Sequence, residues 1–185
     1  MDFWTGINVC FDKESNSKLK ELQRILNATP DLHGQFDLRI PPHITLFEHE
    51  ELRKQVYYDA LESAISKFNS FSLEFTGLTT FPATHVFYLN PKYSSNLQSL
   101  RKLCLETLKN QGVVLDRKSD SMWSPHVTLL LDLPTQEISK AVEFSQNYLD
   151  LQIKKPFIAK ITLIELFSYP PYKAEKKFFL HDKAE

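Results

Sequence analysis

A five-residue pattern, Pro-His-[Ile/Val]-Thr-Leu, occurs twice in the chain, at residues 42–46 and at 125–129. Its two histidines, His43 and His126, stand 83 positions apart. Chance repetition of the whole pattern is expected in roughly 1 of 1,000 chains of this length or fewer. The repeat therefore predicts two similar halves whose histidines face one site.

Two histidines at one site can perform acid–base chemistry on a phosphate ester. The pKa of an unperturbed imidazole is about 6.5, so the ring can give or take a proton near neutral pH. One histidine would take a proton from the attacking oxygen and the other would give one to the departing oxygen. The hydroxyls of Thr45 and Thr128 could bind the non-bridging phosphate oxygens, where charge accumulates. Such a site needs no metal, and we expect none, nor any other cofactor.

The pattern also predicts how each motif is presented. On a strand, residues two apart share a face, so each histidine shares a face with its threonine. The two aliphatic residues of each motif then face the core. The residues predicted to be buried are Ile44, Leu46, Val127 and Leu129. The proline suits the start of a strand, where its missing N–H costs no ladder bond. We expect the rings of His43 and His126 to lie roughly 4–8 Å apart, close enough to bracket one phosphorus.

A zinc site is a weaker alternative for the same residues. It would use His43, Glu48, His49 and His126, but their spacing matches no common zinc signature and no cysteine pair assists. The histidines outside the motif are predicted to be structural or exposed. These are His33, His49, His85 and His181.

Length and composition describe an ordinary globular chain. It has 185 residues, 42% of them hydrophobic and 24% charged, which predicts one domain over 1–185 or two small lobes sharing a core. No apolar run is long enough to span a membrane and no secretory signal is visible, so we expect a cytoplasmic protein with no membrane partner. Cys10 and Cys104 fit buried thiols in a reduced compartment. The net charge of −1 argues against an extended nucleic-acid surface and favours a small or terminal phosphate group as ligand.

Hydrophobic periodicity outlines the elements that must position the motifs. Residues 14–27, for example, place Leu19, Leu22, Ile25 and Leu26 at helical spacing. Helices are predicted over residues 14–27, 51–69, 94–110 and 134–146. Strands are predicted over residues 3–11, 43–47, 71–81, 84–89, 126–131, 149–153, 157–167 and 178–181, with a turn at 168–177. Each half offers strands and helices in a similar order, which predicts an α+β fold with two related sheets and a groove between them.

Two His-x-Thr motifs, each followed by a hydrophobic residue and about 80 residues apart, resemble those of the 2H phosphoesterase superfamily. This superfamily includes the 2′–5′ RNA ligases and 2′,3′-cyclic phosphodiesterases. The likeness extends over most of the chain, through Gly6-Ile7-Asn8-Val9, Val86-Phe87-Tyr88-Leu89 and the closing segments 163–169 and 178–180. It implies a bilobal α+β fold with two pseudo-symmetric antiparallel sheets, flanking helices and a central cleft. It also implies that His43 and His126 are catalytic, with Thr45 and Thr128 as phosphate ligands.

Further substrate contacts are expected near the motifs. Arg39 precedes the first motif, Trp123 precedes the second, and Tyr169 adjoins a Pro-Pro pair. An aromatic ring could stack on a base and a basic side chain could hold a second phosphate. Arg117 and Lys118, in the segment before the second motif, are weaker candidates.

The sequence thus favours a metal-independent phosphoesterase that acts on 2′,3′-cyclic phosphates or 2′–5′-linked nucleotide or RNA ends. Two alternatives stay open. The same histidines could ligate RNA ends by the reverse reaction, or the chain could be a binding module that recognises nucleotide or RNA ends without turnover.

Overall fold

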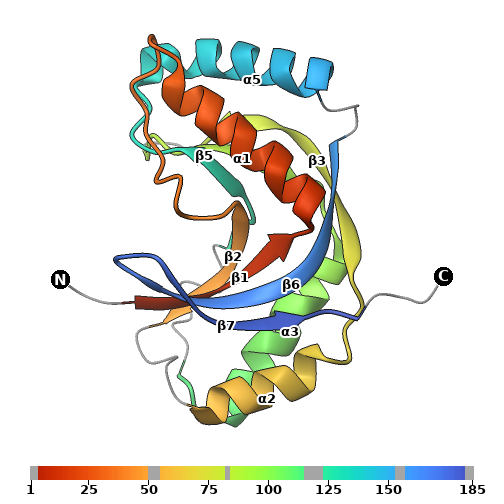
Figure 1. Ribbon diagram of the computed structural model, residues 1–185. Coiled ribbons are helices and arrows are strands. Elements are labelled where there is room, and N and C mark those ends of the chain that lie inside the picture. Colours follow the sequence, from red (N-terminus) through yellow and green to blue (C-terminus); the bar gives the residue numbers. More distant parts are fainter. Residues whose placement is uncertain (1–3, 50–54, 82–83, 115–122, 153–156, 182–185) are drawn as a thin grey trace.

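The computed structural model describes residues 4–49, 55–81, 84–114, 123–152 and 157–181 (Figure 1). Arg117 and Lys118 lie outside the described residues. So do the predicted helix start at 51–54, the link at 82–83 between two predicted strands, and the end residues 3 and 153 of two other predicted strands. No helix in the described part of the chain is long and apolar enough to cross a membrane. Cys10 and Cys104 are buried and unpaired.

In the described part of the chain, seven strands form one continuous antiparallel sheet. They are β1 (Trp4–Phe11), β2 (His43–His49), β3 (Phe71–Thr80), β4 (Phe87–Pro91), β5 (Val127–Leu130), β6 (Phe157–Tyr169) and β7 (Lys173–Phe179). The order is β2-β1-β6-β3-β4-β5, and β7 pairs with β6. The long strand β6 joins the two halves, because its first residues pair with β3 and its later residues pair with β1.

The two motif strands lie at the two ends of this order. β2 ends one side of the sheet and β5 ends the other. The sheet curves strongly, so these distant ends come into contact with each other (Figure 1). Curvature of the sheet, and not closeness in sequence, therefore brings the two motifs to one place.

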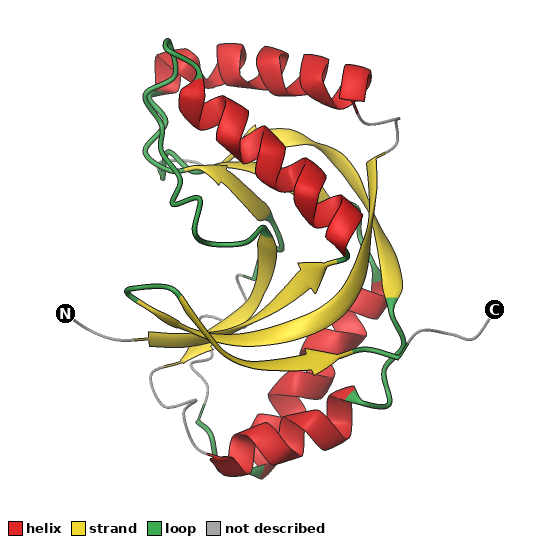
Figure 2. Ribbon diagram, in the orientation of Figure 1, coloured by secondary structure: helices red, strands yellow, loops and turns green. Residues whose placement is uncertain are grey.

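Two pairs of helices cover the two halves of the sheet (Figures 1 and 2). The helices are α1 (Lys13–Ala28), α2 (Gln55–Ile65), α3 (Ser95–Asn110) and α5 (Ile138–Gln152), the last preceded by a 3₁₀ turn at Thr135–Glu137. α1 and α5 cover the half that holds β5, while α2 and α3 cover the half that holds β2. Asp12 caps α1 by accepting a hydrogen bond from the Ser15 N–H (2.7 Å), and Ser94 caps α3.

The α+β class, the antiparallel strands and the flanking helices are confirmed. The two expected sheets are the two halves of one sheet, because β6 is long enough to serve both. The strand predicted at 149–153 is wrong, since α5 runs to Gln152. Its buried residues Ala141, Ser145 and Leu149 are four apart, which is helical spacing. The turn predicted at 168–177 is shorter, because β6 ends at Tyr169 and β7 begins at Lys173.

Candidate functional site

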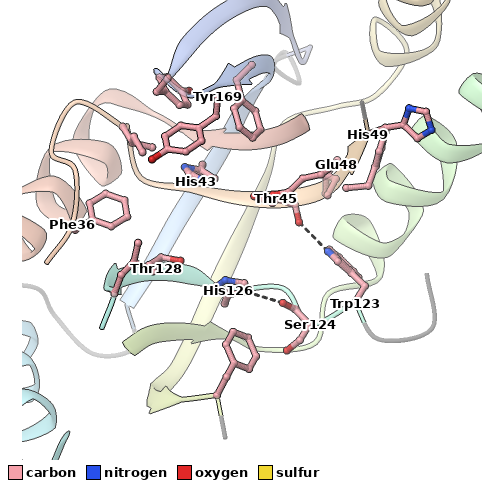
Figure 3. A pocket seen from close by; sticks show the side chains of 17 residues that line it. Phe36, His43, Thr45, Glu48, His49, Trp123, Ser124, His126, Thr128 and Tyr169 are labelled. Carbon is pink, nitrogen blue, oxygen red and sulfur yellow. Dashed lines mark hydrogen bonds between the residues drawn. The ribbon is translucent and has the colours of Figure 1, made fainter. Parts of the chain in front are cut away.

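Both motifs have the strand register that their sequence predicts. Ile44, Leu46, Val127 and Leu129 are all 0% exposed, which confirms that the aliphatic residues face the core. The histidines and threonines lie on the opposite face and line one cleft of about 840 Å³ (Figure 3). A volume of this size is typical of a small-ligand site.

The two histidines are oriented by the same kind of hydrogen bond, from the ring to a backbone carbonyl. His43 Nδ1 lies 2.7 Å from the Pro41 carbonyl oxygen, and His126 Nδ1 lies 2.8 Å from the Ser124 carbonyl oxygen. A carbonyl oxygen only accepts, so Nδ1 carries the proton in each ring. The Nε2 atom of each neutral ring is therefore left as the base, and each histidine is held by the residue two positions before it.

Aromatic side chains enclose both rings. The centroid of His43 lies 6.1 Å from that of Phe167, which stacks on Tyr172 at 5.5 Å. Phe167 in turn lies over Gly6 of β1, where an added Cβ would come within 2.5 Å of its ring. Gly6 therefore allows the aromatic wall to lie directly on the sheet beside His43.

His126 has a matching aromatic pair in the other half. Its ring meets Phe81 edge-on at 4.8 Å and lies 5.2 Å from Tyr88, and these two aromatics stack at 4.2 Å. Each histidine is thus partly shielded from water by aromatic packing, with Phe167 beside His43 and both Phe81 and Tyr88 beside His126.

This shielding changes the titration of both histidines. The pKa of His43 is lowered to about 4, chiefly by burial and to a smaller extent by the nearby His126, against the opposing effect of the Pro41 carbonyl. Burial also lowers the pKa of His126, opposed by the Ser124 carbonyl. Both rings are therefore neutral in the unliganded cleft near neutral pH, so a bound anion would meet no histidine charge until one ring takes up a proton.

The outer edges of the motif strands are closed by side-chain donors. Because β2 and β5 end the sheet, some of their carbonyls have no strand partner. Trp123 Nε1 donates to the Thr45 carbonyl (2.9 Å), and Gln23 Nε2 donates to the Thr128 carbonyl (2.7 Å). Equivalent positions of the two motifs are thus held in place by unrelated residues.

Arg101 supports the first of these contacts. Its Nε donates to the Leu46 carbonyl (3.0 Å), and its guanidinium lies 4.6 Å from the Trp123 ring centroid. Sequence reasoning missed Arg101 and Gln23. The available signal was a polar residue on the buried stripe of a helix, since Arg101 is 8% exposed and Gln23 is 0% exposed.

A β-bulge turns one carboxylate toward the cleft. Thr45 pairs with Asn8, and Glu48 pairs with Gly6. Thr45 and Glu48 are three residues apart on β2, whereas their partners are only two apart on β1. The irregularity between Ile7 and Asn8 shifts the alternation, so Glu48 shares the face of Thr45. Among the described residues that line the cleft, Glu48 is the only one of type Asp, Glu, Lys or Arg. Burial raises its pKa.

The remaining predicted site residues divide into two groups. Trp123 and Tyr169 line the cleft with the motifs. Arg39 does not line it, because the guanidinium is exposed and bound to Asp37 through Nε–Oδ1 (2.8 Å) and Nη2–Oδ2 (2.7 Å). His49 and Glu48 also line the cleft, but among the described residues the four members of the zinc alternative form no cluster that could hold a metal ion.

Comparisons with known proteins agree with this architecture. The family model of the 2′-5′ RNA ligase superfamily matches residues 11–155. The crystal structure of Escherichia coli LigT complexed with 3′-AMP is similar with a TM-score of 0.64 and 15% identity, over 95% of this chain and 97% of that one. TT0787 of Thermus thermophilus is similar with a TM-score of 0.65 and 14% identity, over 98% and 100% of the two chains. A protein of Geobacillus sp. (strain WCH70), provisionally named a phosphoesterase, is 26% identical over 122 residues, 64% of this chain and 67% of that protein.

Proposed function

The chain belongs to the 2′-5′ RNA ligase superfamily, and on this premise we propose that it is a metal-independent phosphoesterase for 2′,3′-cyclic phosphates or 2′–5′-linked nucleotide ends. One observation carries the proposal: two histidines from opposite ends of the sheet line one cleft, and both have Nδ1 bound to a carbonyl so that Nε2 is left to exchange protons. We also propose that the chain is a single domain of two lobes, supported by the sheet that runs through both.

The proposed reaction uses one histidine as base and one as acid. For a cyclic phosphate, one Nε2 takes a proton from the attacking water while the other gives a proton to the departing ribose oxygen. Burial lowers the pKa of both rings, and both have the same Nδ1–carbonyl arrangement, so either histidine can serve as the base with the other as the acid. The negative charge of the bound phosphodiester favours the protonated form of the acid.

The rest of the cleft suits a single nucleotide end. Thr45 and Thr128 would bind the non-bridging oxygens, and Trp123 and Tyr169 offer rings on which a base could stack. Because Glu48 places a negative charge in the same cleft, a substrate with several phosphates is disfavoured. LigT has been crystallised with 3′-AMP, which is a ligand of the same chemical class.

The test is a substrate panel in the presence of EDTA. It contains the four nucleoside 2′,3′-cyclic phosphates and matched 2′–5′ and 3′–5′ dinucleotides, with products separated by chromatography. We expect turnover of the cyclic or 2′–5′ compounds that survives chelation and is lost in His43→Ala and His126→Ala. His33→Ala is the matched control, because His33 is exposed and pairs with Glu137 away from the cleft.

Three outcomes would replace the proposal. Activity that EDTA abolishes and a divalent ion restores would favour metal catalysis. Binding of nucleotide ends without turnover, equal in the wild type and both histidine variants, would identify a binding module. Joining of RNA ends in the same assay would identify the ligase activity.

A further inference from the structure

The two motif threonines differ in what their hydroxyls contact. Thr45 Oγ1 donates to the side-chain oxygen of Asn8 at 3.0 Å, whereas the Thr128 hydroxyl has no hydrogen-bond partner within the described chain. A hydroxyl carries a single proton, so the Thr45 proton points toward Asn8 and its lone pairs face the cleft. In this state Thr45 repels a phosphate oxygen, while Thr128 is ready to donate to one.

Asn8 has a buried amide whose oxygen accepts a hydrogen bond and whose amino group has no acceptor among the described residues. It is paired with Thr45 across β1 and β2 and is 0% exposed. Its Nδ2 group is buried without an acceptor among the described residues. A buried N–H without a partner is costly, and rarer in proteins than a carbonyl oxygen that lacks one. Donation from this N–H to Thr45 Oγ1 would satisfy it whenever the Thr45 proton has another acceptor.

We propose that Asn8 is a positioning residue for Thr45, and that its amino group donates to Thr45 Oγ1 when phosphate is bound. The inference rests on the proposed function, because it takes Thr45 as a phosphate ligand. With Nδ2 as the donor to Thr45 Oγ1, the Thr45 proton is available to a phosphate oxygen. The carbonyl and amino ends of the amide have nearly the same shape, so either end can face Thr45 without repacking.

The pair makes more hydrogen bonds when an anion is present. Without phosphate, the pair makes one hydrogen bond, from Thr45 to Asn8. With phosphate, it makes two in series, from Asn8 to Thr45 and from Thr45 to the anion, and the second is strengthened by charge. Thr128 has no such partner in the described part of the chain, so the two halves of the site bind phosphate by different means.

A double-mutant cycle tests the inference. Asn8→Leu removes the amide at nearly constant size. Asn8→Ala is the second variant, used if Asn8→Leu does not fold. Thermal unfolding shows whether each variant is folded. We expect Asn8→Leu to lower kcat about 3- to 10-fold, the scale of one lost hydrogen bond in a network. In a Thr45→Val background the same change should alter kcat less than about 2-fold, because no hydroxyl remains to be oriented. In a Thr128→Val background it should keep its full effect.

Equal losses in the wild-type and Thr45→Val backgrounds would show that Asn8 only packs β1 against β2, and would overturn the inference. No loss in the wild-type background would overturn it as well. The same cycle measured on the binding of inorganic phosphate by calorimetry separates this result from the proposed function. If no substrate turns over but the phosphate cycle shows coupling to Thr45 alone, the proposed function fails and the positioning role stands. If turnover occurs without coupling in either measurement, only the positioning role fails.

Discussion

Burial of His43 makes the stability of the fold depend on pH in a predictable direction. Its pKa is about 4 in the folded chain, against about 6.5 for an unperturbed histidine in an unfolded chain. Between these values the unfolded chain binds a proton that the folded chain does not, so stability rises with pH there. The contribution is complete above about pH 6.5 and is lost as the pH falls toward 4.

The two pKa values set the magnitude. Lowering the pH from 7 to 5 should remove about 2 kcal/mol of unfolding free energy through His43, and about 3 kcal/mol is lost once both states are protonated. The assay is urea unfolding at pH 7, 6 and 5, compared with His43→Asn. The asparagine amide can still donate to the Pro41 carbonyl but does not titrate. The free energy difference between wild type and variant should therefore shift by about 2 kcal/mol across this range.

His85→Asn is the matched control, because it makes the same replacement at an exposed histidine outside the cleft. Its backbone has a φ of 53°, which asparagine tolerates well. Parallel stability curves for wild type and His43→Asn would refute the reasoning. They would mean that His43 is as well solvated in the folded chain as in the unfolded one, and that the aromatic wall of Phe167 and Tyr172 does not exclude water.

Three further predictions concern the walls of the cleft. Thr45→Val and Thr128→Val should each lower turnover about 10- to 10³-fold through a lost hydrogen bond to the phosphate oxygens, measured as kcat on the best substrate of the panel; unchanged kcat in both would remove the threonines from the mechanism. Glu48→Gln should lower KM for an anionic substrate about 2- to 5-fold, less so in high salt, because a like charge is removed; a raised KM would show that Glu48 binds substrate. Trp123→Phe should lower unfolding free energy by about 1–2 kcal/mol, because the Thr45 carbonyl loses its donor; an unchanged urea midpoint would mean that water replaces the indole.

Several parts of the fold and site could be predicted from local pattern alone. The alternation of residues in Pro-His-Ile-Thr-Leu fixes which side chains face the core, because side chains on a strand have a period of two. The leucine stripe of α1 follows from helical spacing. The repeat of the motif was enough to place both histidines at one cleft.

Features that depend on partners distant in sequence could not be predicted in this way. One continuous sheet arises because β6 pairs with both β1 and β3. The residues of β6 do not indicate in sequence that this strand has two partners. Glu48 faces the cleft only because of a bulge in the pairing of β1 with β2, so simple alternation from Thr45 places it on the wrong face.

The polar supports of the motifs are also tertiary. Gln23 is marked in sequence only as a polar residue on the buried stripe of a helix and Asn8 only as a polar strand residue, and their roles come from contacts with the Thr128 carbonyl and with Thr45. Arg39 shows the opposite case, since its position next to the first motif suggested a phosphate contact, but Asp37, two residues away, holds its guanidinium.

The central claim is that His43 and His126 act together on one phosphate. Its most direct test is the rate of the chemical step for His43→Ala, His126→Ala and the double variant, measured in EDTA on the best substrate of the panel under single-turnover conditions. Each single change should lower the rate about 10²- to 10⁴-fold, because each removes one proton transfer. The double change should cost much less than the product of the two, because both histidines serve one concerted step. Losses that multiply, or a single variant that retains the wild-type rate, would contradict the account.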